Sequence, residues 1–158
     1  MKNIFLIFVL FFCACGYAPL NKATSSSLGE SVNVVTIINK AEPKDSITLS
    51  DNFTNYLEHY MHKSISKYAD SKIVLRILSS DFIALYYDEF GYAKSYKAII
   101  RLEFNVTYKD GKNKKIITSG EHIFNTNQIS VLSDEQKSRA INQASQKAFN
   151  EFALKVIM

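Results

Sequence analysis

The stretch YKAIIRLEFNVTY, from Tyr96 to Tyr108, alternates between apolar and polar side chains almost throughout. Its even positions are all apolar or aromatic, and its odd positions are mostly polar. Because neighbouring side chains of a β-strand point to opposite faces of a sheet, this pattern predicts one long strand with a dry face and a wet face. A helix would scatter the same apolar side chains around its axis. We therefore expect the rest of the chain to fold against this strand.

A second strand is predicted just after it, beyond a tight turn. Asp110 and Gly111 are residue types that accept positive φ angles, so together they are typical of a two-residue hairpin turn. The strand Lys114–Asn125 would then run antiparallel to the first. Gly120 is expected to weaken its middle, because glycine has no side chain to pack.

The segment before the central strand, Lys72–Tyr87, is predicted to be a strand with a bulge. Its apolar residues change from odd to even positions at Ser79–Asp81, and one extra residue in a strand causes such a change of face. The loop Asp88–Ala93 then leads into the central strand.

Further upstream, a strand and a helix are predicted. The β-branched run Val32–Ile38 has apolar residues on both faces, which is typical of a covered strand. Glu42–Asp45 ends it, and Ser50 or Asp51 is predicted to cap a helix. The apolar stripe of this helix comprises Phe53, Tyr56, Leu57, Tyr60, Met61, Ile65 and Tyr68. A strand–helix–strand unit makes its two strands parallel.

The chain ends in a predicted helix. Asn125–Leu132 is a polar loop, and Ser133 with Gln136 three residues later forms a capping-box pattern. Its apolar stripe comprises Ala140, Ile141, Ala144, Ala148, Phe152 and Val156. The order β-α-β-β-β-α predicts an α/β (α+β) fold. We expect a two-layer sandwich with a four-stranded mixed sheet and two helices on one face.

Residues 1–15 are predicted to be a lipoprotein signal peptide. Lys2 precedes the apolar run Ile4–Phe12, which is too short to span a bilayer. A lipoprotein signal peptidase needs a small residue before the cysteine that receives lipid. Ala14 precedes Cys15, so we expect lipidation at Cys15 rather than at Cys13; an ordinary secretory peptide is the alternative.

Lipidation sets the domain plan and the compartment. Residues 16–30, rich in serine and other polar residues, are predicted to be a tether, and residues 31–158 a single domain. Gly16 after the lipidated cysteine favours the outer membrane over the inner membrane, with the protein lipid-anchored on the periplasmic side. Without its signal the chain keeps 18 basic and 15 acidic residues, a net charge of +3. Anionic membrane surfaces, phosphorylated glycolipids or acidic proteins are therefore expected partners, and nucleic acid is not.

No catalytic or metal-binding pattern stands out. His59 and His62 lie three apart on a predicted helix, whereas the zinc-protease pattern needs four with a glutamate between them. There is no nucleophile elbow, phosphate loop or cysteine–histidine set. We therefore expect no enzyme activity, no metal and no cofactor.

The polar face of the central strand is a better candidate for a binding surface. Ile99 lies there among Arg101 and Glu103, and the predicted elements leave no helix to cover it. Ile99, Arg101 and Glu103 are therefore candidate contacts to a partner. Asn105 fits an acceptor pattern of some bacterial oligosaccharyltransferases, but its mid-strand position is not that of an acceptor loop.

With these elements placed, the chain resembles the lipopolysaccharide-assembly lipoprotein (LptE) family over nearly all of its mature length. The matching features are Cys15-Gly16-Tyr17, the βαβ unit, the hairpin Tyr86–Tyr108 with Ala93–Tyr96 entering its second strand, Ile123–Asn125, and Asp134-Glu135 opening an alanine-rich helix. The resemblance implies a non-enzymatic plug inside the outer-membrane LptD β-barrel. Such a plug assists barrel assembly and helps deliver lipopolysaccharide to the outer leaflet.

The resemblance also implies basic lipopolysaccharide contacts at two places, and the chain departs from it there. Asp88-Glu89 and Leu132-Ser133 occupy those positions. The candidate contacts are then Lys94, Lys97 and Lys137, which the topology would bring to the end of the sheet away from the tether. The lysine-rich tip at Lys109–Lys115 would lie beside the tether. Two other functions remain open: a pilotin-like lipoprotein for another outer-membrane pore, or a periplasmic lipoprotein that binds a small ligand.

Overall fold

A computed structural model describes Thr24 and residues 26–38, 43–126 and 131–158. The predicted signal peptide, Cys15 and most of the tether lie outside the described residues. Its elements are β1 (Ser31–Ile37), α3 (Pro43–His59), β2 (Ser64–Ile65), β3 (Ser71–Tyr87), β4 (Ala93–Thr107), β5 (Asn113–Asn125) and α4 (Asp134–Val156).

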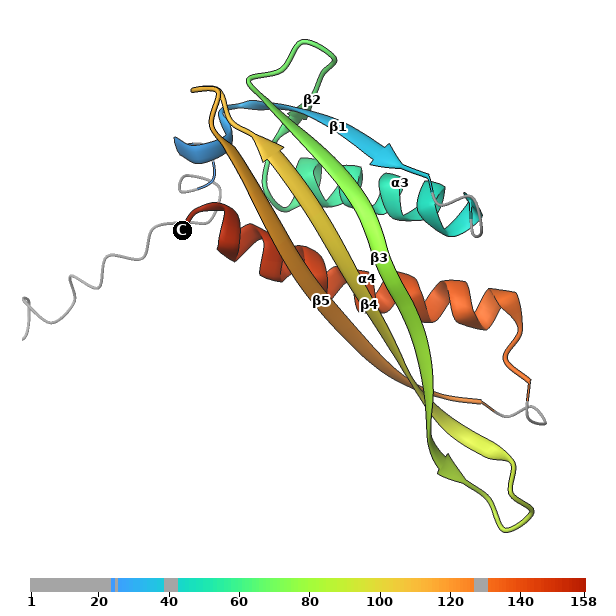
Figure 1. The fold of residues 1–158 in the computed structure, drawn as a ribbon. Coiled ribbons are helices and arrows are strands. Elements are labelled where there is room, and N and C mark those ends of the chain that lie inside the picture. The colour runs from blue at the N-terminus through green and yellow to red at the C-terminus, as the bar shows by residue number, and fades with distance from the viewer. Residues whose placement is uncertain (1–23, 25, 39–42, 127–130) are drawn as a thin grey trace, which may run out of the picture.

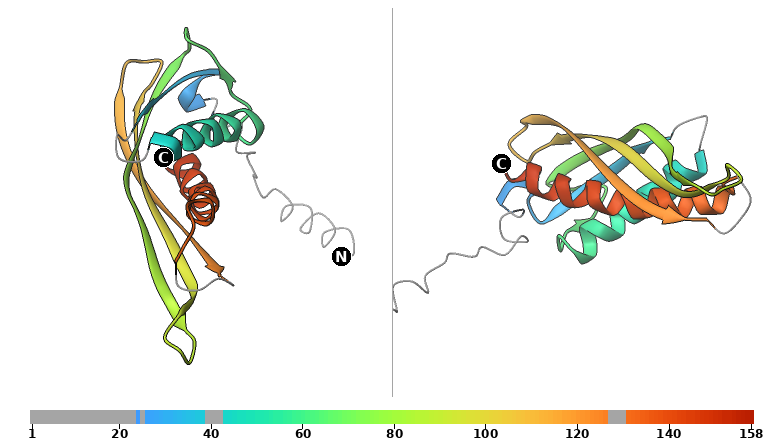
Figure 2. Two further views of the ribbon diagram at one scale, coloured as in Figure 1. Left: turned by 90° about the vertical axis from the view of Figure 1, so that its right-hand side faces the viewer. Right: turned by 90° about the horizontal axis from the view of Figure 1, so that it is seen from below.

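The strands form one mixed sheet in the order β2-β1-β3-β4-β5 (Figure 1). β1 and β3 are parallel, as predicted, and β3, β4 and β5 are antiparallel neighbours. Both α3 and α4 lie on the same side of the sheet, which Figure 2 shows in its left view. The predicted α+β sandwich is therefore confirmed, with five strands in place of four.

The extra strand and the first helix are the main differences from the prediction. The helix begins at Pro43, where a missing N–H costs nothing, so Ser50 and Asp51 are interior residues rather than caps. It ends at His59, because His62 has a left-handed backbone (φ 53°) and reverses the chain. Ile65 then pairs in β2 beside Val32 of β1 instead of continuing the helical stripe.

The predicted bulge in the long strand is confirmed. The pairing of β3 with β4 shifts between Ile77 and Ser79, so the apolar residues on both sides of the bulge can face the helices. Beyond it Phe82 pairs with Ala98 on β4, and both lie on the helix side of the sheet.

The hairpin turns have a different geometry from the predicted one. Of the described non-glycine residues only His62 has a positive φ, so the prediction for Asp110 is wrong. Instead, the Gly111 N–H donates to the Tyr108 carbonyl at 2.9 Å, and Gly111 alone is left-handed (φ 80°). This is the three-residue loop in which a type I turn is followed by a glycine. The loop between β3 and β4 repeats it with Gly91 (φ 81°).

The core is built on the dry face of β4. Phe104 of β4 stacks on Phe152 of α4 with ring centroids 4.3 Å apart, and Phe53 of α3 lies 5.1 Å from Phe104. All three side chains are fully buried. The stripe predicted for the last helix is buried in full, and Phe149 extends it. These aromatic contacts therefore fix both helices to the central strand.

The start of α4 agrees with the sequence. Ser133 Oγ accepts a hydrogen bond from the Gln136 N–H at 3.2 Å, and Gln136 Oε1 accepts one from the Ser133 N–H at 3.1 Å. This is the predicted capping box.

Gly120 has a role that its sequence position did not reveal. A Cβ built on Gly120 would lie 1.9 Å from the Ala144 carbonyl oxygen and 2.9 Å from the Ala148 nitrogen. The backbone of α4 therefore rests directly on β5, and only glycine permits that approach. Gly120 is the point at which the last helix is seated on the sheet.

We predict that Gly120→Ala lowers the free energy of unfolding by about 1–3 kcal/mol, because the added methyl group must push α4 away from β5. Chemical denaturation measures the change. Ser119→Ala, on the exposed side of the same strand, is the control and should change stability little. Equal stability of Gly120→Ala and the parent would contradict the close contact.

Candidate functional site

The sheet face that points away from α3 and α4, called the open face below, carries the predicted partner contacts. It is built from alternate residues of the strands, which on β4 are the odd-numbered ones. Ile99 is half-buried, Arg101 is exposed and Glu103 is buried, at 3% relative exposure. The three predicted contacts thus share one face, but only the first two present their own side chains to a partner.

Glu103 is the centre of an ion-pair cluster on the open face. Arg76 of β3 donates to Glu103 Oε1 at 2.9 Å, and Asn105 donates to the same oxygen at 3.1 Å. Lys115 of β5 pairs with the second carboxylate oxygen. The side chains of Arg76 and Lys115 are about half exposed, so they cover Glu103 while remaining at the surface themselves.

The cluster keeps Glu103 ionised. The hydrogen bond from Lys115 is the largest cause of a lowered pKa at Glu103; desolvation opposes it, and Asn105 and Arg76 add to the lowering. A carboxyl group whose pKa is lowered by folding stabilises the fold above its unfolded pKa. That stabilisation is lost as the pH falls through the lower, folded value.

We predict that Glu103→Gln lowers the free energy of unfolding at neutral pH by about 1–2 kcal/mol, since an amide has no charge to pair with Arg76 and Lys115 and only one oxygen to accept their hydrogen bonds. The difference from the parent should shrink as the pH falls below the ordinary value of 4.5. Denaturation at a series of pH values tests this. Glu121→Gln, whose carboxylate is half exposed, is the control and should change stability less. A loss of stability that does not depend on pH would rule out the electrostatic role.

The open face is also apolar in part, which the sequence did not reveal. Val35 and Ile37 of β1 are 40% and 47% exposed, and Ile117 of β5 is 40% exposed. The run Val32–Ile38 was predicted to be covered on both faces, but no described helix covers this one. Aliphatic and charged side chains therefore alternate across a large solvent-facing sheet.

The three predicted lipopolysaccharide contacts lie at the end of the sheet away from residues 24–31, but they do not form one cluster. Lys94 lies at an irregularity of β4, where the pairing with β3 shifts between Tyr86 and Tyr87, whereas Lys97 lies in the regular part of the strand. Lys137 belongs to α4, on the helix side. Each lysine faces an acidic group: Lys94 pairs with Asp88 at 3.3 Å, Lys97 with Glu121 at 3.3 Å, and Lys137 with Asp134 at 3.7 Å.

The same end carries the predicted β3–β4 hairpin, but the sequence analysis did not anticipate that it projects with an exposed apolar tip. Figure 1 shows the β3–β4 hairpin extending past the end of β5 and the start of α4. Its exposed large apolar residues are Ile83, Leu85, Tyr86, Tyr87, Phe90 and Tyr92. Asp88 holds the tip by accepting hydrogen bonds from the Phe90 and Tyr92 N–H groups at 3.0 and 2.8 Å. Desolvation acts to raise the pKa of Asp88, but these bonds and Lys94 outweigh it, so the pKa is lowered.

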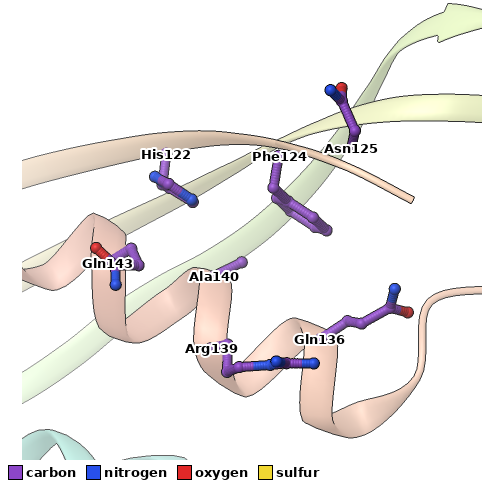
Figure 3. Close-up of a pocket in the computed structure, with 7 residues that line it drawn as sticks. All are labelled: His122, Phe124, Asn125, Gln136, Arg139, Ala140 and Gln143. Carbon is purple, nitrogen blue, oxygen red and sulfur yellow. The ribbon is translucent and has the colours of Figure 1, made fainter. Parts of the chain in front are cut away.

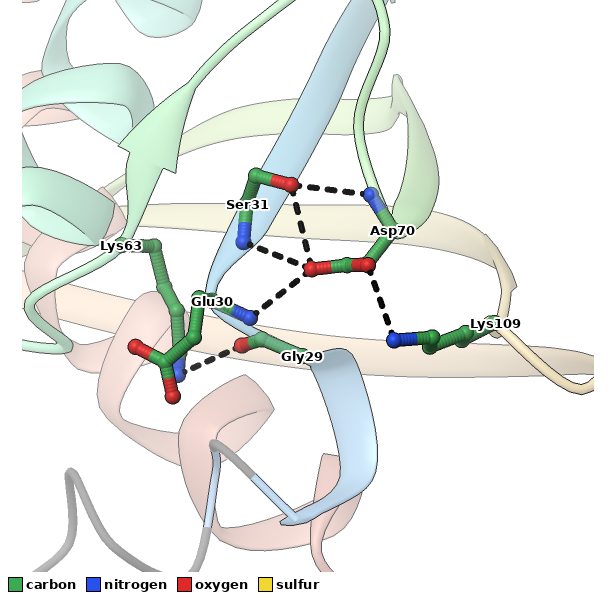
Figure 4. A network of polar contacts seen from close by, with 6 residues as sticks. All are labelled: Gly29, Glu30, Ser31, Lys63, Asp70 and Lys109. Carbon is green, nitrogen blue, oxygen red and sulfur yellow. Dashed lines mark hydrogen bonds and ion pairs between the residues drawn. The ribbon is translucent and has the colours of Figure 1, made fainter.

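The opposite end of the sheet is fixed by Asp70 (Figure 4). Asp70 Oδ2 accepts hydrogen bonds from the Glu30 and Ser31 N–H groups at 3.1 and 3.3 Å, and Lys109 pairs with Oδ1 at 3.3 Å. Lys109 is the largest cause of the lowered pKa of Asp70. The lysine-rich tip therefore lies beside the start of the domain, as predicted. Leu28, placed in the tether by the sequence, is fully buried in the core.

Gly29 makes this junction possible. It is left-handed (φ 77°), and a Cβ there would lie 2.6 Å from the Asp70 Cβ. Lys63, which is 2% exposed, donates to the Gly29 carbonyl at 2.8 Å. Burial lowers the pKa of Lys63, and Glu30 partly offsets this.

Other functional features were sought throughout the described residues. No group of three or more histidine, cysteine, aspartate or glutamate side chains there is placed to hold a metal ion. His59, the last residue of α3, and His62, which lies between α3 and β2, are both exposed. None of the described helices is both long and apolar enough to cross a membrane.

Comparison with known proteins shows the fold. No protein-family model matches the chain, and no curated protein matches it in sequence. A Caulobacter crescentus protein assigned as a lipoprotein aligns with a TM-score of 0.56 and 13% identity, over 89% of this chain and 93% of its own. A DUF330 protein from Xanthomonas campestris aligns with a TM-score of 0.54 and 12% identity, over 83% and 86% of the two chains.

Rare lipoprotein B from Shewanella oneidensis aligns with a lower TM-score of 0.45 and 16% identity, over 80% of this chain and 90% of its own. The alignment with the Caulobacter crescentus lipoprotein shows that the chain has a fold that occurs among bacterial lipoproteins. Membership of the LptE family in particular stays a prediction at these identities.

Proposed function

We propose that the chain is an outer-membrane lipoprotein of the LptE type. It would sit inside an LptD-type β-barrel, assist the assembly of that barrel, and help deliver lipopolysaccharide to the outer leaflet. The observation that carries the proposal is the open face. One side of the sheet is sealed by two helices, whereas the other exposes aliphatic and charged side chains over several strands.

The chemistry of the open face suits the inner wall of a barrel. Membrane barrels are apolar toward lipid and polar toward the lumen. A sheet that directs Arg76, Arg101 and Lys115 outward, interspersed with Val35 and Ile37, can make ion pairs and hydrogen bonds to such a lumen while burying its aliphatic groups. Exposed apolar groups rimmed by polar ones are typical of protein interfaces. Contact with lipid tails would instead require a face free of charge.

The two ends of the domain suit an anchored plug. A lipid on Cys15 would hold the end near Asp70 and Lys109 close to the inner leaflet of the outer membrane. β3 has 17 residues. At about 3.3 Å per residue, its far end lies roughly 55 Å along the strand from the anchored end. The aromatic hairpin tip would therefore reach well into the barrel, toward the side on which lipopolysaccharide must emerge.

Lipidation can be tested separately. Ala14-Cys15-Gly16 provides the small residue and the cysteine that the signal peptidase needs. We predict that Cys15→Ala abolishes incorporation of radiolabelled palmitate, whereas Cys13→Ala leaves it intact. Label that survives in Cys15→Ala would contradict the assignment.

Docking of the open face is tested by photo-cross-linking in cells. A photoreactive amino acid at Ile99 or Arg101 should capture an LptD-type barrel, because these side chains lie on the open face and are not fully buried. The matched control positions are His59 and His62, which are exposed and lie outside the strands that form the open face.

The two sets of positions should differ several-fold in yield. Equal capture from both sets would mean that the open face is not the docking face. Capture of a secretin would favour the pilotin-like alternative, and the absence of any captured barrel would favour a free ligand carrier.

A further inference from the structure

The outer edge of β5 is the strongest unassigned feature of the described chain. β5 ends the sheet order, so one side of its backbone has no neighbouring strand. At the two ends of the β4–β5 pairing, the Tyr108 N–H donates to the Lys112 carbonyl and the Thr126 N–H donates to the Lys94 carbonyl. Because the register between them is continuous, the backbone groups of even-numbered residues of β5 bond to β4. The N–H and C=O groups of odd-numbered residues therefore point to the free edge.

Half of this edge is already closed by α4. Glu151 Oε2 accepts the Ser119 N–H at 2.9 Å, and Lys155 Nζ donates to the Ile117 carbonyl at 2.8 Å. Glu151 and Lys155 also pair with each other at 2.7 Å. Side chains that satisfy an edge in this way protect it from adding another strand.

The other half of the edge is open. Beyond Gly120, no described residue hydrogen-bonds the free-edge backbone of Glu121 or Ile123. Unpaired N–H and C=O groups on a strand edge are a template for pairing with a further extended chain. The protected part of the edge therefore ends at Ser119, next to Gly120, where α4 contacts β5.

A groove opens beside this unprotected half. It has a volume of about 500 Å³ and lies between the end of β5 and the first half of α4. Figure 3 shows His122 and Phe124 pointing from the strand toward the helix, with Arg139, Ala140 and Gln143 on the opposite side. A strand added at the edge would direct every second side chain into this groove.

We infer that the edge at Glu121–Ile123 and the groove beside it bind an extended segment of a partner polypeptide, as an added antiparallel strand. The backbone of the partner would use the free N–H and C=O groups. An apolar side chain would pack on Phe124 and Ala140, and an acidic side chain two residues away would meet Arg139.

The positive charge of Arg139 in the groove favours a partner segment that carries an acidic side chain. Arg139 is the groove's one fully charged lining residue among the described ones, and its side chain is 70% exposed. Its ion pair to Glu135, the only one it makes within the described residues, is long at 3.6 Å and solvated, so a partner carboxylate can compete for it. Main-chain bonds would supply affinity, and the groove would supply specificity. The inference does not rest on the proposed barrel role, which concerns the open face.

The probe for this site is the synthetic peptide KTLTETLTK, in which leucine and glutamate alternate with threonine. The full-length protein in detergent should bind it and should gain amide hydrogen-exchange protection at Glu121 and Ile123. The same peptide N-methylated at its threonines, whose N–H groups face β5 in antiparallel pairing, should lose binding.

Two variants of Ile123 distinguish the contribution of its backbone N–H to peptide binding from that of its side chain. Ile123→Pro removes an N–H that β4 does not use, whereas Ile123→Thr keeps it. We expect Ile123→Pro to bind the peptide about tenfold more weakly and Ile123→Thr to bind it normally. Arg139→Glu should reverse the preference, favouring the peptide whose central glutamate is replaced by lysine.

Several outcomes would overturn the inference. They are equal binding by the two Ile123 variants, undiminished binding of the N-methylated peptide, no reversal in Arg139→Glu, or no binding at millimolar peptide. Protection of Glu121 and Ile123 that rises with protein concentration, without peptide, would assign the edge to a second copy of this chain instead.

Discussion

The contact of Phe104 with Phe152 and Phe53 is the interaction on which the rest of the structure depends. It joins the central strand to both helices with ring centroids 4.3 and 5.1 Å apart. Because the fully buried apolar side chains of β4 share the face of this cluster, both helices lie on one side of the sheet. The open face is then left without a covering helix among the described residues, and many of its side chains are therefore exposed to solvent. It exposes charges and aliphatic groups together, with Glu103 held beneath Arg76 and Lys115.

The close contact of α4 with Gly120 of β5 separates two regions of the molecule that differ in how much of their surface is exposed. On one side of it, Glu151 and Lys155 close the edge of β5, and the core reaches back to Leu28. On the other side the helix leaves the sheet, a groove opens, and the β3–β4 hairpin projects with its aromatic tip (Figure 1). The closed half of the β5 edge thus lies toward the first described residues, and the groove and the exposed hairpin lie away from them.

The sequence predicts those features that depend on local periodicity. The alternation of Tyr96–Tyr108, the bulge near Ser79 and the capping box at Ser133 each come from a few neighbouring residues, and the structure contains all three. The predicted extent of α3 was wrong, because Ile65 continues the helical spacing by coincidence. In the structure Ile65 lies in β2 and pairs with β1. The role of Gly120 depends on a helix more than twenty residues away, so its local sequence gives no sign of it.

The candidate sites show the same division. The pairing of Lys94 with Asp88 joins the two ends of one hairpin loop and was available from the sequence. The burial of Glu103 was not, because it requires Arg76 and Lys115 from two other strands. The account rests on the open face being covered by a barrel, and the most direct measurement is the mass and composition of the complex purified from membranes in mild detergent. A one-to-one complex with an LptD-type barrel is expected, whereas a secretin complex, or the protein alone, would contradict it.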